Sequence, residues 1–299
     1  MSEITNIQWT DHTFNPWSGC AKVSPGCANC YAANLPPAMR RHAIWGPNAE
    51  RIRASAEYLK QPHTWNRKAE KDWRRHRVFC ASVADVFEAR ADLDPWREDL
   101  LCMIRDTPHL DWQLLTKRPE YAAKFLHGRN LPPNLWIGTS VENQDAADTR
   151  IPHLLKIPAK VRFLSMEPLL GPVNLDPATC QYCGNHGENI GLADDGATPW
   201  CTECSNEAGF GWWLDPCADE GQAGINWVIA GCESGRIARP MDLDWVRAIR
   251  DACNSAGVPF FFKQANIDGE IVGLPKLDGE VWAQFPEVEP AANPLFGAP

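Results

Sequence analysis

Six short apolar runs, each of strand length, constrain the fold of this chain more than any other feature. They occupy residues 78–82, 112–116, 135–139, 161–166, 227–231 and 258–262. Most of them are separated by segments with helical character, such as 95–105, 120–127 and 244–256. Alternation of strands and helices predicts a parallel sheet. We therefore expect an α/β fold, a partial or complete parallel (β/α) barrel, with a doubly wound open sheet as the alternative.

Polar side chains stand where each of these runs ends. They are Ser82 and Asp85; Thr116, Lys117 and Arg118; Ser140, Glu142 and Asn143; Glu167; Glu233 and Ser234; Lys263 and Gln264. In barrel enzymes the carboxyl ends of the strands carry the active site. The starts of loops are often polar, so the inference depends on the repetition of this placement after six strands.

A loop near the N-terminus contains three cysteines, Cys20, Cys27 and Cys30, in the spacing C-x6-C-x2-C. Pro25 and Gly26 predict a tight turn that lets the sulfurs of the C-x2-C pair converge on one centre. An iron–sulfur cube with three thiolate ligands keeps one iron open to a substrate. In the alternative, His12 completes a closed four-ligand zinc site, which leaves no open position.

The loop resembles the cluster loop of radical S-adenosylmethionine (SAM) enzymes, whose usual spacing, C-x3-C-x2-C, is three residues shorter. More specifically, the chain resembles a family of phage and bacterial proteins with the pattern W-T-D-x-T-x-N-P-x-x-G-C-x-x-x-S-P-G-C-x-x-C-Y-A, here residues 9–32. The resemblance continues at 165–172, 231–235 and 259–264, and so covers most of the chain.

This resemblance implies a barrel of the radical SAM type, a [4Fe-4S] cluster on the three cysteines, and SAM on its open iron. An electron from the cluster then cleaves SAM to a 5′-deoxyadenosyl radical, which abstracts hydrogen from the substrate. An electron donor such as flavodoxin or ferredoxin is required. We predict Glu167 and Lys263 as catalytic residues. The predicted cofactor-binding residues are Ser82, Asp85, Glu142, Glu233 and Ser234.

A second cysteine array interrupts the strand pattern between residues 176 and 224. Cys180, Cys183, Cys201 and Cys204 form C-x2-C-x17-C-x2-C, a spacing typical of a zinc ribbon. A second iron–sulfur cluster is the alternative, since tetrahedral sulfur sites suit both metals. We therefore expect a barrel over residues 1–285 with a four-cysteine insertion, followed by a tail rich in proline and alanine at 286–299.

Charge is unevenly distributed along this acidic chain, whose net charge is −9. The segment 40–77 contains eleven Lys or Arg residues against four Asp or Glu, and Trp45, Trp65 and Trp73 lie among them. A basic surface with aromatic side chains can bind phosphates and stack bases. We therefore predict a nucleic-acid partner, with a nucleobase of phage DNA as the favoured substrate. In the alternative, the basic segment is a helical face that contacts only solvent. Other possible substrates are tRNA, a free nucleotide or a peptide.

The chain shows no targeting or membrane signal. The N-terminal residues lack a basic run and an apolar core, and no apolar stretch reaches the roughly 20 residues that span a bilayer. We therefore expect a cytoplasmic protein without a membrane partner, in the host cytoplasm if a phage encodes it. In that compartment the paired C-x2-C spacings indicate metal sites rather than disulfides.

Overall fold

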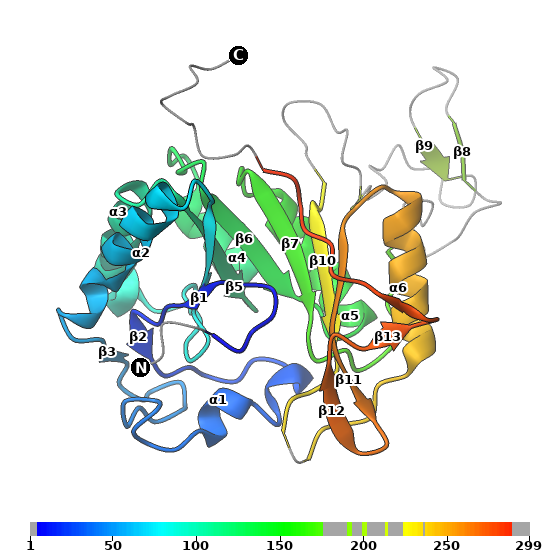
Figure 1. Cartoon of the computed structure of the whole chain (residues 1–299), viewed down its shortest axis with the longest axis horizontal. Coiled ribbons are helices and arrows are strands. Elements are labelled where there is room, and N and C mark those ends of the chain that lie inside the picture. The colour runs from blue at the N-terminus through cyan, green and yellow to red at the C-terminus, as the bar shows by residue number, and fades with distance from the viewer. Residues whose placement is uncertain are drawn as a thin grey trace.

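The chain folds around a curled, mostly parallel sheet that forms half of a barrel (Figure 1). The computed structural model describes residues 5–175, 190–192, 199–201, 213–214, 224–235 and 237–288. In spatial order the strands are β1 (His12–Thr13), β4 (His76–Cys80), β5 (Leu110–Thr116), β6 (Leu135–Ser140), β7 (Val161–Met166), β10 (Trp227–Gly231), β11 (Phe260–Ile267) and β12 (Glu270–Gly273). Only the pairing of β12 with β11 is antiparallel within this sheet. The prediction of a partial parallel barrel is confirmed.

Five helices cover the outer face of the sheet (Figure 1). They are α2 (Gln61–Lys71), α3 (Asp94–Arg105), α4 (Pro119–Leu126), α5 (Gln144–Leu155) and α6 (Leu243–Ser255). The side chain of Asn143 caps α5, and that of Asp242 caps α6. A doubly wound sheet carries helices on both faces, so that alternative is wrong for the described part of the chain.

Shorter elements connect these units. They are β2 (Trp17–Ser18), β3 (Ile52–Arg53), β8 (Ile190–Leu192), β9 (Pro199–Cys201), β13 (Lys276–Leu277), β14 (Glu280–Val281), α1 (Tyr31–Asn34) and single 3-10 turns at Pro25–Cys27, Tyr58–Lys60 and Ala91–Leu93.

The inner face of the sheet changes character along each strand. Near the strand starts it is aromatic, with Trp136, Phe163, Trp227 and Phe261 in one buried cluster. Because side chains alternate between the two faces, inward positions further along β6, β7 and β11 fall on Ser140, Ser165 and Lys263, and these line a cavity. The inner aromatic cluster therefore forms the floor beneath a polar opening.

Two sequence predictions need correction. The polar sequence of segment 48–75 favours a helix, but its first part is extended, because Ile52 and Arg53 pair with β2; within the segment only Gln61–Lys71 forms a helix of more than one turn. Lys263 and Gln264 were expected to follow their strand, but they lie inside β11. That strand continues because β12 folds back along it and pairs with its last four residues.

Other predictions concern residues that lie partly or wholly outside the described part of the chain. Cys180, Cys183 and Cys204 lie outside the described residues, and of Cys201 only the backbone, in β9, is described. The metal-binding insertion therefore stays a prediction. In the predicted tail, Val288 packs against the inner aromatic cluster, while residues 289–299 lie outside the description. None of the helices described is long and apolar enough to cross a membrane.

A glycine on the inner face of the sheet allows the packing of the half barrel to be tested. A Cβ atom at Gly138 would lie 2.3 Å from the Phe163 ring. We expect Gly138→Ala to lower the free energy of unfolding by about 1–3 kcal/mol, the usual cost of overpacking a core. Gly171→Ala is the matched control, because its Cβ would meet only Asn143, at 3.5 Å. Urea unfolding measures both; equal stabilities would contradict the packing described.

Candidate functional site

A cavity of about 580 Å³ opens at the carboxyl ends of the strands. Its size is that of a site for a small-molecule ligand. The three loop cysteines and most of the predicted site residues line it: Cys20, Cys27, Cys30, Ser82, Asp85, Glu167, Glu233, Ser234 and Lys263. The fold thus brings together residues that lie up to 243 positions apart in the sequence. Glu142 is the predicted site residue of the described set that is not on the cavity wall.

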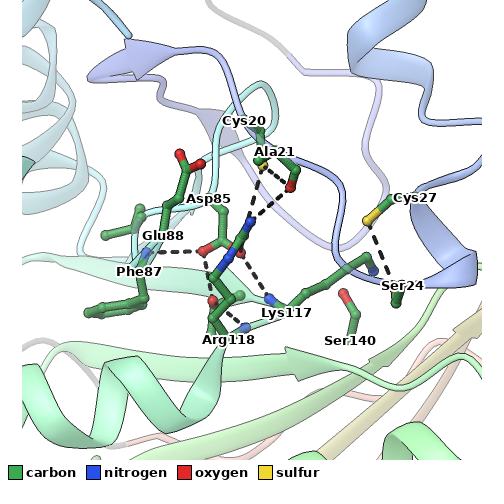
Figure 2. Close-up of polar contacts among 12 residues, drawn as sticks. Cys20, Ala21, Ser24, Cys27, Asp85, Phe87, Glu88, Lys117, Arg118 and Ser140 are labelled. Carbon is green, nitrogen blue, oxygen red and sulfur yellow. Dashed lines mark hydrogen bonds and ion pairs between the residues drawn. The ribbon is translucent and has the colours of Figure 1, made fainter. Parts of the chain in front are cut away.

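Asp85 connects the end of β4 to the cysteine loop through Arg118 (Figure 2). Its carboxylate accepts hydrogen bonds from Thr116 Oγ1 at 2.7 Å and Arg118 Nη1 at 2.7 Å. Arg118 also donates to the carbonyl oxygen of Ala21 at 2.8 Å and to Cys20 Sγ at 3.9 Å. Both charges are buried, so each needs the other. This pair therefore fastens the first cysteine to the sheet.

Glu142, which follows β6, lies beneath the middle of the loop. It accepts a hydrogen bond from Ser24 Oγ at 2.5 Å and pairs with Lys117 at 3.3 Å and Arg150 at 2.6 Å. These partners outweigh burial and lower the pKa of Glu142. A Cβ atom at Gly26 would lie 2.2 Å from Glu142 Oε1, so only glycine allows the loop to approach this closely.

Glu233, which follows β10, holds the last part of the loop. Its carboxylate accepts hydrogen bonds from Asn29 Nδ2 at 3.0 Å and from Arg239 Nε at 3.0 Å. Burial alone would raise the pKa of Glu233, but the bonds from Arg239 and Asn29 outweigh it and lower the pKa to about 2. The carboxylate is therefore ionised at neutral pH.

The start of the loop is anchored to the end of β4. The Asn15 carboxamide bonds to the Ser82 hydroxyl at 3.0 Å and accepts from the Val83 amide at 3.0 Å. The Gly19 amide donates to the carbonyl of Val83 at 3.0 Å, and Gly19 has φ +107°, a conformation that side chains disfavour. The sequence motif thus contains the residues that shape the loop as well as the cysteines.

These contacts bear on the predicted cofactor-binding residues. Asp85, Glu142 and Glu233 are each bonded, directly or through one arginine, to residues of the cysteine loop. The hydroxyl of Ser82 is bonded to Asn15, and that of Ser234 accepts from Gln264 at 2.8 Å. Positioning the loop is therefore a role that the structure assigns to most of this set, and their contact with a cofactor stays a prediction.

The three loop cysteines are partly buried free thiols. Burial and the neighbouring Asp85 carboxylate raise the pKa of Cys20 to about 12, so this thiol is protonated at neutral pH when it binds no metal. Within the described residues, no three His, Cys, Asp or Glu side chains are close enough to hold a single metal ion. A cluster is a different case, because each thiolate binds a different iron. Three thiols around one cavity match that donor set.

His12 does not join these cysteines. It lies in β1, where its ring stacks on Trp65 with centroids 4.4 Å apart, and its Nε2 is 3.1 Å from Nδ1 of His76. The four-ligand zinc site built on His12 is therefore not assembled in this structure. The cause is the parallel pairing of β1 with β4, which directs His12 to the opposite side of the strand from the cavity.

Sequence reasoning missed several residues of the site. Cys232 follows an apolar run, which favours a position in the core; although its side chain is only 1% exposed, it also lines the cavity. Trp9 and Trp45 line it too. The position of Cys232 directly after β10 was the available signal, because its neighbour Glu233 was selected on that ground. Nothing in the sequence pairs Arg118 with Cys20.

The basic segment is largely balanced by carboxylates from elsewhere in the chain. The ion pairs are Arg51–Glu88, Arg53–Asp99, Arg74–Asp11, Arg75–Asp111 and Arg77–Asp11. Four carboxylates outside the segment thus offset much of the charge excess that motivated a nucleic-acid partner. Trp65 is buried rather than presented on a basic surface. Arg40 and Arg41 contact backbone, hydroxyl and ring atoms instead of carboxylates.

The depressed pKa of Glu233 predicts a pH dependence of stability. Its pKa is about 2 in the folded chain and ordinarily 4.5, so its stabilising contribution is complete above pH 4.5 and falls as the pH drops toward 2. The stability difference between the wild type and Glu233→Gln should therefore shrink over that window in urea unfolding. Glu120→Gln, at an exposed position on α4, is the control. A difference that is independent of pH would contradict this assignment.

One comparison with known proteins has a match. The model of a family described as "Protein of unknown function (DUF5131)" matches residues 4–286. No curated protein and no solved structure matches the chain. Because the family match spans nearly the whole sequence, the chain belongs to the DUF5131 family.

Proposed function

We propose that this protein is a radical SAM enzyme. A [4Fe-4S] cluster on Cys20, Cys27 and Cys30, with SAM, would supply the reductive cleavage that makes a hydrogen-abstracting radical. The observation that carries the proposal is that all three thiols line the same cavity as the polar strand ends of a half barrel. A metal site that only stabilises a fold has no need of an adjoining cavity of this size.

The surrounding side chains support a site that is held rigidly on the sheet and has an apolar floor. Arg118, Ser24 and Asn29 connect the loop to three strand ends, so the three sulfurs are held relative to the sheet. Trp9 and Phe79, with ring centroids 4.7 Å apart, belong to the aromatic floor. A closed, apolar floor protects a reactive intermediate from solvent. The protein would still need a one-electron donor, such as flavodoxin or ferredoxin.

A non-catalytic, metal-stapled nucleic-acid-binding protein is the alternative proposal. It uses the same cysteines but requires a metal that has no open position, such as zinc. The two proposals differ in metal content, and in whether SAM is bound and cleaved.

Replacing a loop cysteine distinguishes the enzyme proposal from the non-catalytic one. We expect Cys20→Ala, Cys27→Ala and Cys30→Ala each to abolish SAM cleavage and to remove the visible absorption and the roughly four irons of a [4Fe-4S] cluster after anaerobic reconstitution. Circular dichroism should show that the barrel stays folded. Cys102→Ala is the matched control, because Cys102 is exposed on α3. Zinc instead of iron at these cysteines, or SAM cleavage that survives Cys27→Ala, would contradict the proposal.

We further propose that the substrate is a nucleobase, with DNA favoured, and that segment 40–77 contacts the polyanion. Since the arginines at 51, 53, 74, 75 and 77 are in ion pairs, the contact would depend on other cations. Lys60, Lys68 and Lys71 are exposed at the start, along the length and at the end of α2. Together with Arg40 and Arg41 they supply positive charge that is not paired with a described carboxylate.

Charge reversal on α2 tests this partner. For the triple variant Lys60→Glu/Lys68→Glu/Lys71→Glu we expect weaker DNA binding and a salt dependence reduced by about 0.9 per lost phosphate contact on a log–log plot. Lys124→Glu/Lys156→Glu, at exposed positions elsewhere, is the control. Fluorescence anisotropy over a salt series measures both. Unchanged affinity and slope would identify α2 as a solvated face, and tRNA, a nucleotide or a peptide would then become the substrate to test.

A further inference from the structure

Glu167 and Lys263 form an ion pair inside the cavity, with Lys263 Nζ 2.8 Å from Glu167 Oε1. Glu167 directly follows β7, and Lys263 lies in β11. The two side chains are only 11% and 18% exposed. Unlike Asp85, Glu142 and Glu233, the Glu167 carboxylate has no hydrogen bond to the cysteine loop in the described structure; its hydrogen bond comes from Ser165, at 3.3 Å. The pair is therefore free of the loop-positioning role.

The backbone around the pair is shaped to present it. Ala230 pairs with Phe262, but the next residue, Gly231, pairs with Gln264, so Lys263 is the extra residue of a β-bulge. Bulges of this kind redirect a side chain next to functional sites. A Cβ atom at Gly231 would lie 2.9 Å from Glu167 Oε1, so a glycine there leaves room for the carboxylate.

The Glu167 carboxylate retains bonding capacity. The contact from Lys263 is not aligned as a hydrogen bond, and Glu167 Oε1 is a buried atom without a hydrogen-bond donor among the described residues. Leaving a buried acceptor without a donor is costly. By contrast, the Asp85 carboxylate takes four donors, from Thr116, Arg118 and the backbone amides of residues 87 and 117. A ligand that donates to Glu167 would therefore remove a penalty.

The sign of the charges limits the ligand. A simple anion attracted to Lys263 would be repelled by Glu167, because the charged groups of the two residues are 2.8 Å apart. A simple cation attracted to Glu167 would be repelled by Lys263. A zwitterion satisfies both groups, because its ammonium can donate to Glu167 Oε1 while its carboxylate accepts from Lys263 Nζ. The four charges then alternate and sum to zero, which suits a poorly hydrated site.

We propose that Glu167 and Lys263 bind the α-amino-acid zwitterion of a ligand. The inference rests on the proposed function, in which that group is the amino-acid end of SAM; a free amino acid presents the same chemistry. Glu167 and Lys263 are then specificity-determining residues for the ligand rather than acid–base groups.

The test measures binding, without turnover, by isothermal titration of anaerobically reconstituted protein. The titrants are S-adenosyl-L-homocysteine, which carries the zwitterion, 5′-methylthioadenosine, which shares its nucleoside but lacks the zwitterion, and L-methionine. Glu167→Gln/Lys263→Met removes both charges and so leaves no lone buried ion. Arg53→Met/Asp99→Asn neutralises an ion pair that is 40% and 60% exposed, and is the control. We expect the cavity variant to bind S-adenosyl-L-homocysteine at least tenfold more weakly, with less than a threefold change for 5′-methylthioadenosine.

The outcomes separate the inference from the function on which it rests. If the wild type binds both nucleosides and the cavity variant binds them equally well, the zwitterion subsite is overturned and the SAM proposal stands. If the wild type binds neither nucleoside and no L-methionine, both fail. If it binds only L-methionine, and the cavity variant loses that binding, the subsite stands for a free amino acid and the SAM proposal fails. A variant that reverses the pair, Glu167→Lys/Lys263→Glu, should also lose the zwitterion while preserving a buried ion pair.

Discussion

The organisation of the site depends on three buried carboxylates, Asp85, Glu142 and Glu233, which follow three different parallel strands. Each is buried, so it requires cations or hydrogen-bond donors. The cysteine loop and the arginines beside it supply those donors. The position of the loop is thus coupled to the curvature of the sheet, because the ends of the strands set the distances between the three carboxylates. A loop of this length without such contacts would sample many conformations.

The cavity itself results from a change of side-chain type along the inner face. Trp227 is central to the floor, where it packs edge-on or tilted against Trp9, Trp136, Phe163 and Phe261. At the opposite end of the same strands, serines and charged residues line the open space. Large rings at one end of the strands and small or polar residues at the other place the opening beside the cysteines. Glu167 and Lys263 face this space without a bond to the cysteine loop in the described structure, so they are available to a ligand.

Electrostatic pairing explains why the count of charges along the sequence was a poor guide to the surface. The segment 40–77 is strongly basic when taken alone, but Asp11 pairs with Arg74 and Arg77, and Glu88 with Arg51. Ion pairs join residues that are distant in the sequence. The net charge of one segment therefore does not give the electrostatic potential at the protein surface. The Arg51–Glu88 pair is almost fully buried, and Arg51 also donates to the carbonyl of Gly46, whose amide donates to the carbonyl of Cys20.

The sequence by itself determined the α/β class and the parallel sheet, because strand-length apolar runs alternate with helical segments. The choice of a half barrel over a complete barrel or a doubly wound sheet came from the structure. It also placed polar residues at the ends of the first five of these strands, and the motif around Cys20, Cys27 and Cys30 located the loop; Lys263 and Gln264 instead lie inside β11. Only the tertiary structure decided what those residues touch. That Asp85 reaches the loop through Arg118, that His12 turns toward His76, and that a bulge directs Lys263 to Glu167 all depend on strand register and on pairing between distant segments. Local pattern carries no information on these, because hydrogen bonds and ion pairs are satisfied by whichever groups the fold brings together.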